Sequence, residues 1–413
     1  MKAPVDLIVY NTSEVLTLAG PKRPRRGVEM SDLAAIAHGA VAVKDGRIVA
    51  VADRAKILAG YEGDTELDAG GRLVMPGFVD AHTHLVYAGS RADEMQRKIA
   101  GESYLDILKS GGGIRATVKA VRAADEDVLF NQATRRLDQV LAHGATTVEI
   151  KTGYGLNAEA ELKLLRVIER LQHTHAVDVV AAFLGAHIVP SDQARQDYLD
   201  WLSGSALETA KPYARFFDVF CEQEAFSIQE TERLLRAARA AGFRLKVHAG
   251  QFYSLGAAGL AADLGAVSVD HCDHLGNDEI EKMSRAGTVA VLLPGATFFT
   301  GSPTYADART LIARGVPVAL ATDFNPGSCP CFSMQMIVAL ACLKMRMTAA
   351  EAVVAATINA ARAIDKGEEV GSLEPGKKAD LIILNIDSVE QLPYHFGVNL
   401  VYRVIKTGRV YGQ

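Results

Sequence analysis

The decisive stretch of this sequence reads Met75-Pro76-Gly77-Phe78-Val79-Asp80-Ala81-His82-Thr83-His84. It is an apolar run that ends in two histidines separated by one residue. Side chains at positions i and i+2 of a strand point to the same face of a sheet. His82 and His84 are therefore expected to project together from the end of a buried strand. Two neutral imidazoles that converge in this way are a common beginning of a metal site.

The chain beyond these histidines alternates apolar runs with helical stretches, which favours βα units and a parallel sheet. Together with the run that leads to His82, eight strands are expected, the others at residues 146–151, 179–184, 216–220, 245–248, 266–271, 289–293 and 316–321. Polar residues follow nearly every run, as expected for a site on the C-terminal rim of a barrel. The sequence therefore predicts an α/β fold with a (β/α)8 TIM-type barrel. An open doubly wound sheet is the alternative.

Both ends of the chain have the pattern of a small β domain. Short alternating runs occur at residues 6–10, 39–44, 47–51, 379–384 and 401–405. Asp45-Gly46, between two of these runs, is a strong hairpin signal. We expect the two ends to build one composite β-sandwich domain. Its predicted parts are residues 1–72 and 369–413, and the barrel is predicted over residues 73–368.

The composition excludes several classes of function. The 413 residues are 49% hydrophobic and 23% charged, with a formal net charge of −5, so we expect no nucleic-acid partner. No apolar run has the length of a membrane span, and the N-terminus lacks a secretory signal. Five cysteines favour a reduced, cytoplasmic compartment. The basic segment at residues 21–27 is expected to be a solvated loop.

Two further strand ends carry residues that bind metals in proteins. His248 ends the fifth predicted strand, and Asp323 follows the eighth. Strands one and eight are neighbours in a closed barrel, so Asp323 is expected beside His82 and His84. Any one of these residues alone is more often a rim histidine or a helix cap. Together they predict a site for one metal ion, for which zinc is the chemical default and iron the alternative.

Longer segments resemble a known family. Pro76–His84 and Gly371–Leu381 are similar to the amidohydrolase superfamily. Within it, the chain resembles the imidazolonepropionases in four segments, at residues 111–118, 149–156, 183–187 and 322–328. The resemblance implies a metal-dependent barrel with a composite β domain and a homodimeric assembly. It also implies hydrolysis of a small-molecule substrate, 4-imidazolone-5-propanoate, to N-formimidoyl-L-glutamate in histidine degradation.

This substrate has a carboxylate tail and a small polar ring, which suggests roles for residues near the strand ends. Arg91 has the planar donor fork that suits a carboxylate, although a surface salt bridge is its default role. Tyr154 and His187 could hydrogen-bond the ring or the tail. The remaining candidates follow Asp323 and could hold the other end of the substrate: Asn325, Gly327 and Ser328.

Gln251 separates this chain from related deaminases, which place a proton-shuttling glutamate three residues after the fifth-strand histidine. Glutamine can bind the ring but cannot exchange a proton usefully near neutral pH. Asp323 and His271 are therefore the predicted catalytic residues. The fourth strand offers no lysine for a second metal ion, and Lys151 on the second strand is a weak substitute.

Two alternatives remain open at this point. One is another mononuclear amidohydrolase, such as a heterocycle deaminase, although Gln251 counts against it. The other is a non-catalytic barrel scaffold, against which all four candidate ligands count.

Overall fold

Eight parallel strands form the barrel, in the order in which they follow one another along the chain. The computed structural model describes residues 1–102, 106 and 111–412. The barrel strands are β6 (Phe78–Asp80), β7 (Ala145–Lys151), β8 (Asp178–Ala186), β9 (Phe216–Cys221), β10 (Arg244–Ala249), β11 (Ser268–His271), β12 (Val289–Leu292) and β13 (Val318–Leu320). Each overlaps one of the eight predicted runs, so the predicted barrel is confirmed over the open sheet.

The barrel closes where the decisive stretch meets the end of the last strand. Asp80 accepts hydrogen bonds from the backbone and the hydroxyl of Thr322, at 3.0 and 2.6 Å. One step further, the backbone N–H of Asp323 donates to the carbonyl of His82 at 3.0 Å. Gly77 permits the close approach to the neighbouring strand, because a Cβ there would lie 2.4 Å from the side chain of Thr146. Barrel closure therefore also brings the two histidines to the aspartate.

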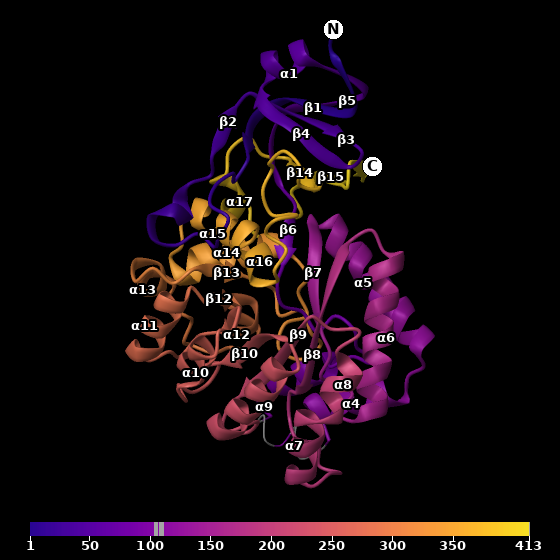
Figure 1. The fold of residues 1–413 in the computed structure, drawn as a ribbon, viewed down its shortest axis with the longest axis vertical. Helices are drawn as coiled ribbons and strands as arrows, with labels where there is room; N and C mark the ends of the chain where they lie inside the picture. The colour runs from indigo at the N-terminus through magenta and orange to yellow at the C-terminus, as the bar shows by residue number, and fades with distance from the viewer. Residues whose placement is uncertain (103–105, 107–110, 413) are drawn as a thin grey trace.

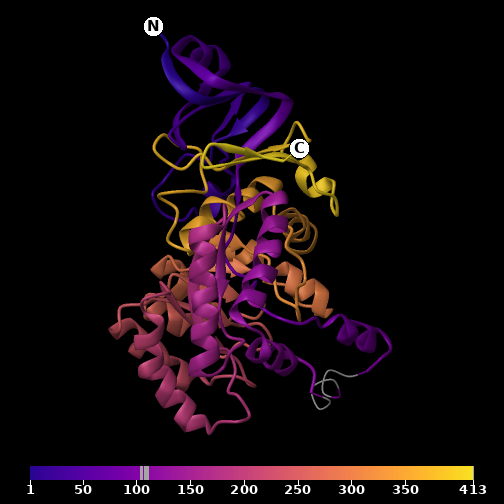
Figure 2. The same cartoon turned by 90° about the vertical axis from the view of Figure 1, so that its right-hand side faces the viewer.

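Helices connect and cover the barrel strands. They are α2 (Ala92–Ile99), α4 (Ile114–Ala123), α5 (Glu126–Ala142), α6 (Ala158–Thr174), α7 (Arg195–Ser203), α8 (Ser205–Ala210), α9 (Ile228–Ala240), α10 (Ala257–Asp263), α11 (Asn277–Ala286), α12 (Pro294–Thr300), α13 (Ala308–Ala313), α14 (Met334–Met345), α15 (Ala349–Ala355) and α16 (Ile358–Ala363). Figure 2 shows α2 projecting from the side of the barrel. Within the described ranges, no helix has the length and apolar character needed to cross a membrane.

The two ends of the chain build one small domain, as predicted. Its strands are β1 (Ala3–Leu16), β2 (Ala35–Ala37), β3 (Gly39–Lys44), β4 (Arg47–Asp53), β5 (Tyr61–Pro76), β14 (Leu381–Leu384), β15 (Val401–Lys406) and β16 (Arg409–Tyr411), with α1 (Arg54–Gly60), α17 (Gln391–Tyr394) and a 3-10 turn at Gly27–Ser31. These strands form a single mixed sheet, in which β1 and β5 are parallel. The predicted Asp45-Gly46 hairpin turn is present, with φ of 49° and 70°.

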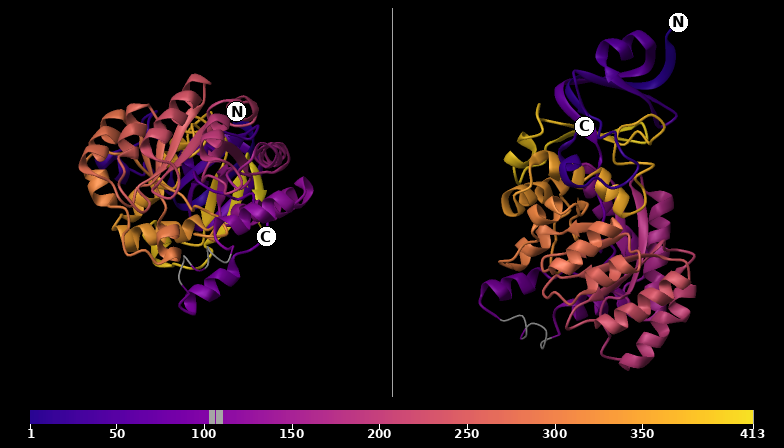
Figure 3. Two further views of the ribbon diagram at one scale, coloured as in Figure 1. Left: turned by 90° about the horizontal axis from the view of Figure 1, so that it is seen from below. Right: turned by 60° about the vertical axis from the view of Figure 1, so that its left-hand side comes forward.

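The small domain and the barrel lie at opposite ends of an elongated molecule (Figures 1 and 3). The chain passes from β5, which ends at Pro76, directly into β6, which begins at Phe78. The N-terminal ends of the barrel strands therefore face the small domain, and their C-terminal rim faces away from it. That rim is the end of the barrel on which sites are built in this architecture.

The basic segment at residues 21–27 differs in one respect from the expected solvated loop. Arg25 is buried, with 1% of its surface exposed. Its guanidinium donates to the carbonyls of Leu18, Ala19 and Asp32. A buried arginine needs such acceptors because its charge cannot be neutralised. The composition of the segment does not reveal them, since all three are backbone groups.

Candidate active site

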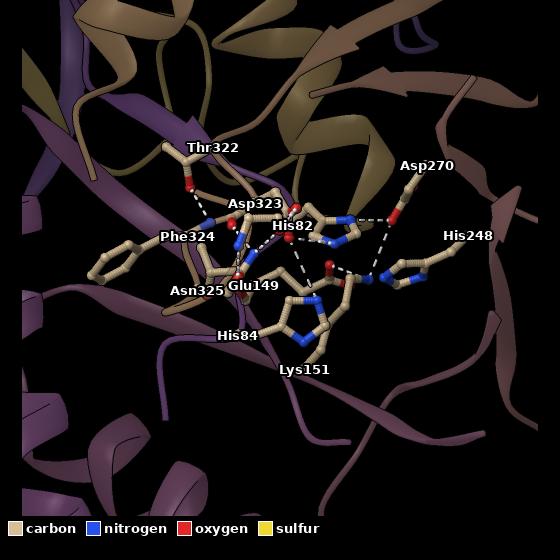
Figure 4. A network of polar contacts seen from close by, with 12 residues as sticks. His82, His84, Glu149, Lys151, His248, Asp270, Thr322, Asp323, Phe324 and Asn325 are labelled. Atoms are coloured by element: carbon tan, nitrogen blue, oxygen red, sulfur yellow. Dashed lines mark hydrogen bonds and ion pairs between the residues drawn. The ribbon is translucent and has the colours of Figure 1, made fainter. Parts of the chain in front are cut away.

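Three histidines and one aspartate meet at the C-terminal rim of the barrel (Figure 4). All four of the predicted ligands, His82, His84, His248 and Asp323, are buried there. The Nε2 atoms of His82 and His84 lie 3.5 and 3.6 Å from the same oxygen, Oδ1 of Asp323. The ring centroids of His82 and His248 are 4.4 Å apart. The structure therefore brings together residues that are separated by more than 200 positions in the sequence.

The ring nitrogens at this rim fit a metal ion. Among the described residues, His82 Nε2, His84 Nδ1, His248 Nε2 and His271 Nδ1 are buried without a hydrogen-bond partner. Such an atom costs about 1–3 kcal/mol when nothing else satisfies it. Burial lowers the pKa of His82 and of His84 well below 6.5, so both imidazoles are neutral, which is the form that binds metals. Ligand atoms of His82, His84 and Asp323 lie within 4.8 Å of one another.

Two residues at this rim have an unusual backbone conformation. Asp323 has a φ of 56° and His271 a φ of 80°, both in the left-handed region. For residues other than glycine this conformation costs about 1–2 kcal/mol. Strain of this kind persists only where the surrounding structure holds it, and it clusters at active sites. It occurs here at both predicted catalytic residues.

The loop after β13 orients the carboxylate of Asp323. The Ser328 hydroxyl donates to Asp323 Oδ2 at 3.1 Å. Asn325 in turn donates to Ser328 Oγ at 2.7 Å and accepts the N–H groups of Gly327 and Ser328, both at 2.8 Å. The amide of Asn325 is thus engaged within its own loop. The two oxygens of Asp323 have different surroundings, since Oδ1 faces the histidines and Oδ2 accepts from Ser328.

Tyr154 and His187 line the same rim beside His84. The His187 ring stacks on the His84 ring with a centroid distance of 5.1 Å and an interplanar angle of 17°. The Tyr154 ring lies 5.6 Å from His84 and is buried. His187 also contacts the carbonyl of Gly153 through Nδ1, at 3.1 Å. Both residues therefore lie in the layer next to the predicted ligands.

Glu161 holds the loop that carries Tyr154, a role that sequence reasoning missed. Its buried carboxylate accepts the backbone N–H groups of Gly153, Gly155 and Leu156, at 3.2, 2.7 and 2.9 Å. Glu161 lies in the first turn of α6. A glutamate in that position carries no special signal, because acidic residues favour the first turn of any helix.

Arg91 lies at the rim with part of its guanidinium already engaged. Its Nε and Nη2 donate to Glu94 Oε2, at 3.0 and 2.9 Å. Its Nη1 points to Gly327, where a Cβ would lie 1.9 Å away. Glycine at position 327 therefore leaves room for this arginine. The carboxylate of Glu94 also accepts the N–H of Gly113, at 2.8 Å, and ties the following segment to the rim.

His271 and Gln251 complete the predicted set. His271 ends β11, and its ring centroid lies 5.5 Å from that of His248. Burial lowers the pKa of His271 to about 3, so the ring is neutral. Gln251 lies partly exposed on the loop after β10. The two residues that follow it, Phe252 and Tyr253, donate their N–H groups to Glu222 at 3.0 and 3.2 Å, which fixes this loop.

Charged residues beneath the histidines were largely missed by sequence reasoning. Asp270 lies 2.7 Å from His82 Nδ1, and Asp218 lies 3.0 Å from His248 Nδ1. Lys151 binds Asp218 at 2.7 Å. The available signal is the presence of charged residues inside runs that are otherwise apolar, at positions such as Glu149 and Lys246. That pattern is rare in buried strands unless the charges are paired.

Known proteins resemble this chain along nearly its whole length. The sequence profile of the amidohydrolase family matches this chain in two overlapping stretches, residues 65–108 and 96–411. A curated imidazolonepropionase of Symbiobacterium thermophilum is 47% identical over 98% of this chain and 97% of its own. Another, of Caldanaerobacter subterraneus subsp. tengcongensis, is 44% identical over 97% of this chain and 96% of its own.

Solved structures share the fold at lower identity. An adenosine deaminase from Xanthomonas campestris with bound zinc has a TM-score of 0.73 at 20% identity, covering 99% of this chain and 93% of its own. The guanine deaminase of E. coli has a TM-score of 0.72 at 16% identity, covering 98% of each chain. At these identities the likeness concerns the fold alone.

Proposed function

This chain belongs to the imidazolonepropionase family of the amidohydrolases, and from that premise we propose that it hydrolyses 4-imidazolone-5-propanoate to N-formimidoyl-L-glutamate in histidine degradation. Water adds across the cyclic amide, and the ring C–N bond breaks. The observation that carries the proposal is the meeting of all four expected ligands at one rim, with ring nitrogens that lack a partner among the described residues.

We propose that His82, His84, His248 and Asp323 hold one metal ion per chain. Three imidazoles and one carboxylate suit zinc, and iron takes the same ligands. Such an ion lowers the pKa of a coordinated water and polarises a carbonyl oxygen. One ion is favoured over two, because β9 contains no lysine and Lys151 is engaged by Asp218 and Glu149, at 2.7 and 2.8 Å.

Asp323 is proposed as the base that takes the proton of the attacking water. Burial raises its pKa to about 7 in the absence of a metal. A bound cation would lower that pKa and keep the carboxylate ionised, which is the form that can accept a proton. Ser328 holds Oδ2 from one side and leaves Oδ1 directed at the histidines. The carboxylate can therefore face the water and the ligand cluster at the same time.

His271 is proposed to stabilise the carbonyl oxygen as it gains charge by donating a hydrogen bond to it, while Asp323 returns the proton taken from water to the leaving ring nitrogen. Its neutral state supports this role, since a neutral imidazole has one donor and one acceptor nitrogen. Its left-handed backbone aims the ring from the end of β11 toward His248. His271 thus keeps its own proton throughout, and Asp323 moves one proton from the water to the leaving nitrogen.

The substrate is proposed to lie between the two sides of the rim. Arg91 would bind the carboxylate tail by charge-assisted hydrogen bonds, which are stronger than neutral ones. The ring or tail would contact Tyr154, His187 and Gln251. The loop after β13 would close the other end, through Asn325, Gly327 and Ser328.

Product analysis tests the proposed reaction. The purified protein is mixed with 4-imidazolone-5-propanoate, ultraviolet absorbance follows the substrate, and mass spectrometry identifies the product. We expect formimidoylglutamate and no ammonia. Asp323→Asn, which keeps the size of the side chain, is expected to lower turnover by about 100-fold or more. Release of ammonia from a panel of heterocycles, without ring opening of this substrate, would instead indicate a deaminase.

We also propose a homodimer in the cytoplasm. Tyr394, Phe396 and Val398 expose large apolar side chains within one short segment, which supports a covered surface. All five cysteines are free, which supports a reducing compartment. Light scattering of the purified protein at low micromolar concentration tests the assembly, and a monomer mass would contradict it.

A further inference from the structure

Five ionisable side chains fill the barrel directly beneath the histidines. We call them the buried charge cluster: Glu149, Lys151, Asp218, Lys246 and Asp270. None of the five side chains has measurable exposure, and their two positive and three negative charges leave a net charge of −1. Buried charges are costly unless they are paired in good geometry. A cluster of this size therefore calls for a function.

The cluster reaches the proposed metal site through two histidines. Asp270 Oδ2 lies 2.7 Å from His82 Nδ1, and Asp218 Oδ1 lies 3.0 Å from His248 Nδ1. A carboxylate can only accept, so each Nδ1 carries the proton and donates it. Each Nε2 is then bare and lacks a partner among the described residues. The two carboxylates thus select the tautomer that can bind a metal through Nε2.

Lys151 joins these two carboxylates. Its Nζ lies 2.7 Å from Asp218 Oδ2. It also lies 3.3 Å from Asp270 Oδ2 and 2.8 Å from Glu149 Oε2 (Figure 4). Without the ammonium group, Asp218 and Asp270 would be like charges in a dry barrel. Their mutual repulsion would then favour turning one of them away from its histidine. One lysine therefore fixes both histidine contacts.

Lys246 belongs to the same cluster and shares Glu149 with Lys151. Among the described residues, however, it makes no ion pair with Asp218. Its Nζ donates to Glu149 Oε2 at 2.9 Å and to the carbonyl of Ala81 at 3.1 Å. It approaches Asp270 only to 3.8 Å. Lys246 carries the same charge in the same buried environment, but it does not join the two carboxylates that bind the histidines.

We propose that Lys151 is a positioning residue, which acts through Asp218 and Asp270 to hold His82 and His248 as Nε2 ligands. The inference rests on the proposed metal site. It opposes the simplest electrostatic expectation, in which a lysine near a cation weakens the binding of that cation. On that expectation, removing the lysine would strengthen metal binding. On our proposal, removing it weakens metal binding, so the sign of the effect separates the two.

The test compares Lys151→Met with Lys246→Met, because each removes one positive charge from the buried charge cluster. Zinc affinity of the metal-free proteins is measured by competition with a chromogenic chelator. Loss of a group that orients metal ligands typically costs about 10–100-fold in affinity, and we expect this for Lys151→Met. For Lys246→Met we expect affinity equal to or above that of the wild type. The cobalt(II) absorption spectrum should change in the first variant only.

Three results would overturn the proposal. One is Lys151→Met binding zinc as tightly as the wild type or more tightly. Another is an equal loss in both variants. Thermal unfolding of the metal-free proteins reports folding, and Lys151→Gln replaces Lys151→Met if the latter does not fold. The third result is that neither Lys151→Met nor Lys151→Gln folds while Lys246→Met does, because Lys151 would then be structural. A wild type that binds no zinc would refute the proposed metal site itself.

Discussion

Replacing Glu161 by glutamine is expected to lower kcat/KM, although Glu161 is not among the residues proposed to touch the substrate. Its carboxylate accepts three backbone N–H groups of the loop that carries Tyr154. Glutamine has nearly the same shape but replaces one acceptor oxygen by a donor. The substitution therefore weakens the hold on the loop without opening a cavity.

The size of the effect follows from the hydrogen bonds. Oε1 of Glu161 accepts from both Gly155 and Leu156, whereas Oε2 accepts from Gly153 at the longer distance of 3.2 Å. The glutamine will therefore place its NH2 group on the Oε2 side, where it faces another donor. A buried donor left without an acceptor costs about 1–3 kcal/mol. Since 1.4 kcal/mol is a factor of ten, this cost corresponds to a fall in kcat/KM of about fivefold to 140-fold.

Glu351 provides the control. It is also a buried glutamate, in the first turn of α15, and it accepts the N–H of Thr348 at 2.8 Å and the guanidinium of Arg309 at 2.5 and 2.8 Å. It does not anchor the loop that carries Tyr154. Steady-state kinetics and thermal unfolding are measured for both variants. We expect similar losses of stability, but a loss of kcat/KM in Glu161→Gln only. If Glu161→Gln lost stability and kept its kcat/KM, the loop would not position the substrate and the reasoning would be wrong.

Three further predictions concern the rim. His271→Ala should keep zinc affinity near that of the wild type and lower kcat about 100-fold or more, as expected for the loss of a donor that stabilises the developing oxyanion; unchanged turnover would exclude this role. Gly327→Ala should raise KM about tenfold, because its Cβ would displace Nη1 of Arg91 and weaken a charge-assisted bond, and an unchanged KM would speak against Arg91 as the tail ligand. In the metal-free protein the rings of His187 and His271 should stay neutral down to about pH 5, since burial lowers the pKa of both to about 3. An NMR titration of the histidine ring carbons checks this, and a His187 or His271 ring that titrates near about pH 6.5 would contradict their burial as neutral rings.

Those parts of the molecule that depend on local pattern could be predicted from the sequence. The eight strands are visible as apolar runs of β-branched residues, and the order of parallel strands follows from the helices between them. Barrel closure then requires the first and last strands to meet. That single topological step is enough to place Asp323 beside His82 and His84. The domain boundaries and the roles of the site residues remain predictions.

Contacts between distant strands could not be predicted in the same way. Asp218, Asp270 and Lys151 come from three strands, and their pairing depends on the stagger of the barrel. A lysine in a strand is usually exposed, which hid the role of Lys151. The burial of Arg25 was missed for a related reason, because its acceptors are backbone carbonyls that carry no sequence signal.

The central claim is that one metal ion at the rim supports ring opening of 4-imidazolone-5-propanoate. The most direct measurement titrates metal-free protein with zinc, and separately with iron(II), while formimidoylglutamate formation is followed. We predict no turnover without metal and a linear rise that ends at about one ion per chain, as a single four-ligand site requires. Turnover that survives complete metal removal, or a rise that continues to two ions per chain, would contradict this claim.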